Sequence, residues 1–468
     1  MITKKVALKV LNAALSTGGD YAEIYLEENF SQSISVDNGC VEKIAKNETY
    51  GAGIRILNGF QSVYGYTSTL TEKKLLALAE TLAKKFNEPR KITVNDIERQ
   101  KVKNINKIKR HLLDVPTEDI INYLKETNSL IASYDKRIVR SITSFANNKK
   151  NIVIFSSEGE TGKEFHNTEE RGRAFFFAYA SNGEKITTGM SNIARYDGWD
   201  YFTKKVDYKK VALQAAEKAI QMLSAKECPS GRYPVVIKNG WGGVLFHEAC
   251  GHSLEATATA KKLSVFSDSI GKQIASPLVT AYDDGTLSNY WGSNNIDSEG
   301  HVTQKNLLIK DGICCGFLVD KFNARRLNMP ANGTSRRQSY KYEPTSRMSN
   351  TYIAAGKDNP ADIIKDTKLG IYVADFGGGS VQPSTGEFNF SASEAYIIRD
   401  GKICEPVSGC TLIGSGKEVL MNIDRVGTDV AQGSGNCGSV SGSVPVNVGQ
   451  PTIRVKEMTV GGRGGKLE

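Results

Sequence analysis

Apolar and polar residues follow two different rhythms in the first half of the chain. A helical period marks residues 6–15, 70–86, 118–133 and 208–223. A period of two, typical of strands, marks residues 21–26, 33–36, 53–56, 62–66, 138–158 and 170–197. The turns Asp37-Asn38-Gly39 and Asn58-Gly59 indicate antiparallel hairpins among the first of these strands. The order helix, strands, helix occurs twice, so the pattern predicts two related lobes.

After about residue 226 the pattern changes. Residues 233–237 read as a strand that leads into one helical stretch, and short strands with Gly, Asn, Asp and Ser turns then follow to the end. A mostly antiparallel region of this length commonly forms one domain. We therefore expect an α+β protein with an N-terminal domain over residues 1–225 and a β-rich domain over residues 226–468.

The helical stretch carries the chain's main chemical signal, His247-Glu248-Ala249-Cys250-Gly251-His252. A helix that starts near Trp241 would carry both imidazoles and the carboxylate. Neutral imidazole is a common zinc ligand, and a Glu beside the first His can act as general base toward metal-bound water. The segment is therefore a candidate metal site with Glu248 as its base.

The spacing of the two His residues needs a distortion of the helix. Residues four apart lie roughly 40° apart around an α-helix, whereas residues five apart lie roughly 140° apart. A local π-type bulge would bring His247 and His252 together, and Gly251 permits such a distortion. The spacing alone is not diagnostic of a metal site, and the alternative is a buried His with a surface Glu.

Three further cysteine or glutamate residues are possible members of this site. Cys250 projects away from the arc that holds Glu248 and His252, which favours a packing role. Glu255 lies on that arc and is either a third ligand or a carboxylate outside the ligand set. Cys437 lies in a glycine-rich stretch that we expect to be a loop, and its thiolate would complete a set of two His and one Cys.

Composition excludes several classes of protein. The net charge of +9 is spread over 60 basic and 51 acidic residues with no recognition motif, so a solvated lysine-rich surface is expected in place of nucleic-acid binding. The eight Cys show no CxxC pair and no regular framework, which predicts free thiols in a reducing cytoplasm. The chain start is unlike a secretory signal, and no stretch approaches the roughly 20 apolar residues that span a bilayer. We expect a cytoplasmic protein without a membrane partner.

Several motifs in order resemble the TldD/PmbA family, on its TldD side. They are HEACGH, RRQSY with RMSNTY, PSTGEF with SASEAY, EPVSGCTLIGSG, and the final CGSV with VPVNVGQPTIRV, between residues 229 and 463. The resemblance implies a cytoplasmic zinc metallopeptidase with an HExxxH motif and a dimeric assembly. Members of this family have also been called modulators of DNA gyrase.

Transferred residue by residue, the resemblance implies Zn²⁺ ligands at His247, His252 and Cys437 and a catalytic Glu248. Ser253 and Ala256 depart from the family pattern, which has glycines there, and Cys250 replaces an apolar residue, yet no proposed ligand is lost. We predict hydrolysis of peptide bonds in unfolded polypeptides or short peptides, by a homodimer or a heterodimer with a PmbA-like paralogue.

Two questions stay open at this point. The alternative function is a regulatory or binding subunit of a TldD/PmbA-type assembly with little hydrolysis of its own, although an intact HExxxH argues against it. The second question concerns three arginines, which either grip substrate carbonyls or a terminal carboxylate, or pair with acids and brace loops: Arg336, Arg337 and Arg347.

Overall fold

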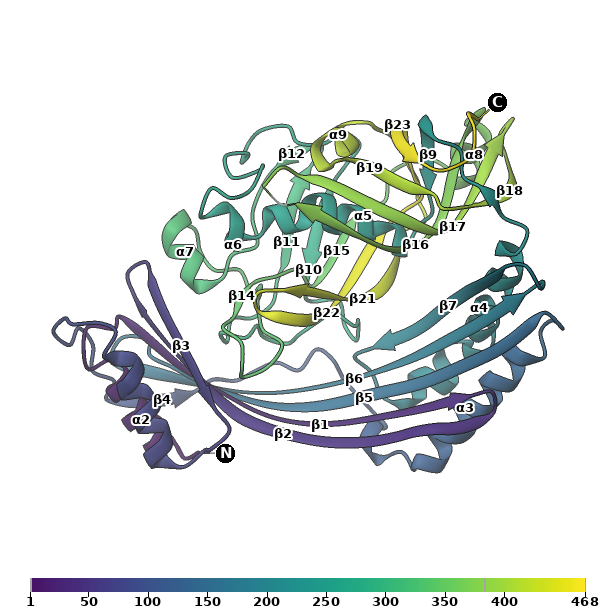
Figure 1. Ribbon diagram of the computed structural model, residues 1–468. Coiled ribbons are helices and arrows are strands. Elements are labelled where there is room, and N and C mark those ends of the chain that lie inside the picture. Colours follow the sequence, from purple (N-terminus) through teal and green to yellow (C-terminus); the bar gives the residue numbers. More distant parts are fainter. Residues whose placement is uncertain (1, 383, 468) are drawn as a thin grey trace.

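The computed structural model describes residues 2–382 and 384–467 and shows an α+β fold (Figure 1). Its first half is built on one seven-stranded sheet with the order β3-β2-β1-β5-β6-β4, in which β7 pairs with β6. Among the described strands of this sheet, β4 and β6 pair in parallel and the other pairs are antiparallel. The strands are β1 (Tyr21–Asp37), β2 (Cys40–Asn58), β3 (Gln61–Thr67), β4 (Asp96–Arg99), β5 (Ile138–Ser156), β6 (Thr161–Ser181) and β7 (Ile186–Arg195). The helices are α1 (Lys4–Ala14), α2 (Glu72–Ala83), the 3₁₀ turn Leu112–Asp114, α3 (Thr117–Ala132), the π turn Tyr201–Lys205 and α4 (Tyr208–Met222).

The long strands of this sheet are buried on both faces over part of their length. On one face of β1, Ala22, Ile24 and Leu26 pack with α1 and α2, while Ile34 and Val36 pack with α3 and α4. On the other face, Tyr25 packs with Ile296 and Tyr340 of the second half of the chain. The sequence pattern predicted four short strands before residue 68. That number is wrong, because the three strands β1, β2 and β3 occupy this part of the chain.

The second half contains two larger sheets. The six-stranded sheet has the order β12-β11-β10-β15-β22-β21, and in the eight-stranded sheet β16 pairs with both β9 and β17, which closes a ring of strands. The strands are β8 (Lys226–Glu227), β9 (Gly231–Ile237), β10 (Ala281–Asp284), β11 (Lys305–Lys310), β12 (Ile313–Cys314), β13 (Ser335–Arg336), β14 (Thr345–Ser346), β15 (Asn350–Ile353), β16 (Leu369–Gln382), β17 (Glu387–Arg399), β18 (Lys402–Ser408), β19 (Thr411–Ser415), β20 (Ile423–Val426), β21 (Ala431–Ser439), β22 (Gly442–Gln450) and β23 (Ile453–Gly461). Short helices join them: α5 (Val244–Phe246), α6 (Ala256–Thr259), α7 (Lys321–Leu327), α8 (Pro360–Lys365) and α9 (Gly416–Met421).

The helical stretch that carries the HExxxH motif lies inside the second half. Val244, Leu245, Phe246 and Ala249 belong to one buried cluster with residues of both sheets, such as Ile371 and Val448. Burial of these side chains is the main stabilising term for so short and irregular a helix. The motif is thus held by packing on both sides.

A buried ion network joins the two halves. Arg55 on β2 pairs with Glu23 on β1 at 2.8 Å and with Glu299 of the second half, and all three side chains are fully buried. Arg337 of the second half also pairs with Glu23. Burial opposes the charged carboxylate, but attraction to Arg55 and Arg337 outweighs it and lowers the pKa of Glu23. The halves therefore meet through compensated charge as well as apolar contact.

The division of the chain between residues 225 and 226, and the relation between two lobes in the first half, stay predictions from the residue pattern. Within the described residues, no helix has both the length and the apolar character needed to cross a membrane.

We predict that Arg55→Met destabilises the fold strongly, because buried Glu299 would lose its arginine and buried Glu23 would lose one of its two. Breaking a buried ion network in this way costs about 3–5 kcal/mol. Urea unfolding followed by circular dichroism measures the loss. Lys9→Met is the control, since the Lys9–Glu72 pair has side chains 48% and 41% exposed and its loss should matter far less. Equal losses in both variants would contradict a structural role for the network.

Candidate metal centre

The helical stretch that carries the motif changes its pitch at the two His residues. A 3₁₀ turn at Trp241–Gly243 leads into α5, and a π turn follows over His247–Gly251. The N–H of His252 donates to the carbonyl of His247, five residues earlier, and a 3₁₀ turn at His252–Leu254 ends the stretch. The expected π-type bulge is therefore confirmed, and it places the two imidazole centroids 5.0 Å apart.

Tight packing accompanies this distortion. A Cβ on Gly251 would lie 2.1 Å from Sδ of Met348, so a larger residue would require the buried Met348 side chain to move. Cys250, on the opposite side of the turn, is fully buried in the core, as expected for a packing residue. Met348 and Cys250 belong to the same buried cluster, which surrounds the π turn.

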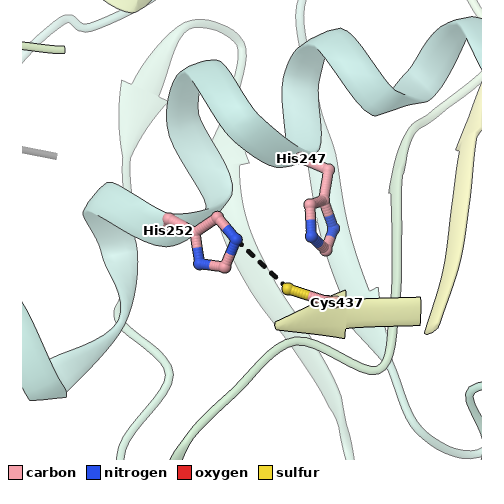
Figure 2. A group of neighbouring side chains, drawn as sticks. All are labelled: His247, His252 and Cys437. Carbon is pink, nitrogen blue, oxygen red and sulfur yellow. Dashed lines mark hydrogen bonds between the residues drawn. The ribbon is translucent and has the colours of Figure 1, made fainter. Parts of the chain in front are cut away.

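Cys437 meets the two His residues from another element. It lies on β21 and not in a loop, because the glycines around it pair with β22 in a regular antiparallel register. Its Sγ lies 3.2 Å from Nε2 of His252 (Figure 2), and the candidate ligand atoms of His247, His252 and Cys437 all lie within 4.8 Å of one another. Folding thus brings together the three residues that the sequence predicted as metal ligands.

Glycines on β21 make this approach possible. A Cβ on Gly435 would lie 2.6 Å from the Trp241 ring at the start of the helical stretch. The strand can therefore pass close beneath that ring, with Cys437 two residues further on.

Charge at the site favours the thiolate. Burial would raise the pKa of Cys437, but attraction to His247 and His252 and hydrogen bonds from them outweigh it and lower the pKa to about 3. Burial alone would lower the pKa of His252, but attraction to Glu255 and Cys437 outweighs burial and raises that pKa well above its usual value. The thiolate is the form of cysteine that binds a metal, so the surroundings of Cys437 favour its metal-binding form.

Glu255 occupies the far side of His252. Nδ1 of His252 donates to its carboxylate at 3.1 Å, while Nε2 faces Cys437. Glu255 is not among the grouped ligand atoms, so of the two roles left open by the sequence the geometry favours the carboxylate that orients a ligand. Such carboxylates fix the tautomer and direction of a metal-binding imidazole.

Glu248, the acidic residue of the HExxxH motif, is partly exposed to solvent. Its side chain is 24% exposed, and Oε2 lies 3.7 Å from Nε2 of His252. The carboxylate therefore lies beside the three candidate ligands and is open to water.

The residues present fit a metal ion. Two imidazoles and a thiolate are a usual donor set, and three protein ligands leave a fourth position for water or substrate. Nδ1 of His247 is buried and has no hydrogen-bond partner among the described residues. The site thus has the donors, the charge and an unused polar atom that metal binding requires.

A second group of possible ligands, Asp297, Glu299 and His301, fits a cation less well. Asp297 accepts hydrogen bonds from the backbone N–H groups of Glu299, His301 and Ser335. Glu299 is neutralised by Arg55. These carboxylates already have partners, so the group serves the junction between the two halves.

The structure assigns bracing contacts to the three arginines named above. Arg337 pairs with Glu23, and Arg336 donates to the carbonyl of Met348 at 2.6 Å. Arg347 donates to backbone carbonyls of Cys437 and Gly442. Sequence reasoning missed the link between Arg347 and the Cys437 strand, since nothing in a linear pattern ties residues so far apart.

Models of three domains of one protein family match most of the chain. Residues 22–85 match the PmbA/TldA metallopeptidase domain 1, residues 110–223 the central domain, and residues 230–462 the C-terminal domain of the same family. The chain belongs to the TldD/PmbA family of metallopeptidases. A metalloprotease TldD homolog of Haemophilus influenzae is 36% identical over 95% of this chain and 93% of its own length. One from Buchnera aphidicola of Schizaphis graminum is 34% identical, with the same coverage of both chains.

Solved structures share the fold at lower identity. A candidate modulator of a DNA gyrase from Thermotoga maritima superposes with a TM-score of 0.78 at 19% identity, covering 94% of this chain and 96% of that one. TldE from Thermococcus kodakarensis gives 0.73 at 19% identity, covering 94% and 97%. The names of these relatives support a metallopeptidase, and a metallopeptidase requires a metal. The solved structure named as a gyrase modulator has the same fold as this chain.

We predict that Cys437→Ala loses most bound metal, whereas Glu255→Ala keeps it at saturating zinc, because that carboxylate orients His252 and is not a ligand. Metal content per purified chain, by mass spectrometry of the elements, is the measurement. Cys250→Ala is the matched control, since it removes a buried thiol from the same site region without touching the ligand atoms. Metal retained by Cys437→Ala at the control level would contradict the ligand set.

Proposed function

We propose that this chain is a zinc-dependent metallopeptidase in which His247, His252 and Cys437 hold the ion and Glu248 is the general base. The convergence of these three side chains beside an accessible carboxylate is the observation that carries the proposal. When bound, zinc would supply Lewis acidity toward water and the scissile carbonyl. The family relatives named as metalloproteases support the same reaction class.

The chain's own groups account for proton movement and orientation. Glu248 takes a proton from the attacking water and passes it to the leaving amine, a task that needs a carboxylate open to the substrate. Glu255 holds His252 through Nδ1, so Nε2 stays directed at the site. With an ion bound, the thiolate of Cys437 would offset part of its charge and leave the site at about +1, enough to polarise water.

The surroundings of the site support an extended peptide as substrate. β21, which carries Cys437, lies at the end of its sheet and can add a peptide as a further strand. A cavity of about 540 Å³ between the two halves of the chain is lined by Asn436 and Val444, the neighbours of Cys437 along β21 and across the β21–β22 pair, but not by His247, Glu248, His252 or Cys437. Because a strand edge pairs only with an extended chain, we propose unfolded polypeptides and short peptides as substrates.

The assembly and location form part of the proposal. The likeness to a TldE structure supports a TldD/TldE-type assembly, either of two copies or with a PmbA-like paralogue. Eight free thiols, three of them exposed, suit a reducing cytoplasm. The alternative, a regulatory subunit with little hydrolysis, leaves the accessible Glu248 beside the ligand cluster without a task.

Glu248→Gln should abolish peptide hydrolysis and leave zinc content near normal, because the amide cannot accept the proton from water and is not a ligand. Peptide-library digestion together with metal analysis of the same preparation checks both points. Glu255→Gln is the companion variant, which should lower the rate and not abolish it. Hydrolysis by Glu248→Gln above a few per cent of wild type would remove Glu248 from the mechanism.

We also expect the protein to cleave an unfolded chain but not the same chain when folded. A small domain and its destabilised point mutant, which share every potential cleavage site, are digested side by side and the fragments are counted by mass spectrometry. Strong preference for the destabilised mutant is the expected result. Equal cleavage of both would contradict a site restricted to extended chains.

A further inference from the structure

The two elements that bring ligands to the candidate metal centre are joined by a buried dipeptide, Arg347-Met348. On the helix side, the N–H of Met348 donates to Oε1 of Glu255 at 3.3 Å, and Nε of Arg347 lies 3.9 Å from the same oxygen. Glu255 in turn receives Nδ1–H of His252. The helix ligand His252 is therefore held, through one carboxylate, by residues 347 and 348.

On the strand side, the same arginine holds Cys437. Its guanidinium donates to the carbonyl of Cys437, to the carbonyl of Gly442 at 2.8 Å and to Oγ of Ser441 at 3.0 Å. These acceptors form the end of β21, the turn and the start of β22. One planar fork thus fixes the backbone on both sides of the turn that follows the cysteine.

The contacts close into a ring. It runs from His252 to Glu255, from Glu255 to Arg347, from Arg347 to the backbone of Cys437, and from Sγ of Cys437 back to Nε2 of His252. Arg347 is 1% exposed, so its cation is removed from water and depends on these partners. Its hydrogen bonds go to the strand side, and its link to the helix side is the buried ion pair with Glu255 at 3.9 Å.

We propose that Arg347 is a positioning residue that sets the distance between His252 and Cys437 and thereby the affinity of the centre for zinc. The inference rests on the proposed function, because it takes these residues as zinc ligands. Arg347 touches neither ion nor substrate in this account. It acts through Glu255 on one ligand and through the backbone on the other.

Arg347→Lys tests the proposal, because lysine keeps the positive charge but cannot reach three acceptors and Glu255 at once. The full-length protein is stripped of metal, its fold is checked by circular dichroism and thermal melting, and its zinc dissociation constant is measured by competition with a chromophoric chelator. We expect the affinity to fall about 10–100-fold, the usual effect of losing a group that orients metal ligands. The melting temperature of the metal-free variant should change little by comparison.

Arg336→Lys is the matched control. Arg336 is also buried, belongs to the same segment, and donates to the carbonyl of Met348, but the structure gives it no bond to the Cys437 strand. Its zinc affinity should stay at the wild-type value. A folded Arg347→Lys protein with wild-type zinc affinity, or an equal loss in Arg336→Lys, would overturn the proposal.

The double variant Glu255→Gln with Arg347→Lys adds a second readout. If both residues act in one ring, their effects on zinc affinity combine to less than the sum of the two single losses. Strictly additive losses would overturn the ring. Should Arg347→Lys fail to fold, Ser441→Ala removes a single acceptor of the guanidinium, and faster zinc release is expected; an unchanged release rate would count against the proposal.

The wild-type measurement separates this inference from the proposed function. A wild-type protein that binds no zinc would remove the metallopeptidase assignment itself. Tight zinc binding by wild type with no effect of Arg347→Lys would remove only the positioning role.

Discussion

The geometry of the candidate centre depends on one turn of helix with a five-residue hydrogen bond. In a regular α-helix His247 and His252 would point in directions roughly 140° apart and could not share an ion. The π turn brings the rings together, and Gly251 lets it lie against the Met348 side chain. Each later feature of the site presupposes this turn, from the approach of Cys437 to the direction of His252.

The remainder of the fold keeps the turn and its partner strand in place by using buried charge. Arg55, Glu23, Glu299 and Arg337 join the N-terminal sheet to the second half, and Arg347 joins the helix to β21 within it. Buried ion pairs stabilise little in net terms, but losing one partner is costly, so they favour a single arrangement over its neighbours. In this protein that arrangement places a cysteine against two histidines that lie some 185 residues earlier in the chain.

Residue patterns predicted the α+β class, the π-type bulge and the packing role of Cys250, because each depends on neighbours in sequence. They divided β1 into two strands, at residues 21–26 and 33–36, whereas it is one strand over Tyr21–Asp37. Its alternation is hidden because Tyr21 to Glu27 are all buried, with helices on one face and the second half of the chain on the other. The patterns also placed Cys437 in a loop, since glycines usually disfavour strands, whereas here they let β21 pass beneath Trp241. The contacts of Arg347 with Glu255 and with Cys437 are tertiary contacts, so the pattern of residues along the sequence could not predict them.

Cobalt substitution tests the central claim most directly, because it reports which atoms bind the metal without relying on activity. The metal-free protein is loaded with one equivalent of Co²⁺ and its absorption spectrum is recorded. Coordination by His247, His252 and Cys437 predicts an intense near-ultraviolet sulfur-to-cobalt charge-transfer band together with the visible bands of a low-coordinate ion. A spectrum with visible bands but no sulfur band, or with the pale bands of cobalt bound only by oxygen and nitrogen, would contradict it.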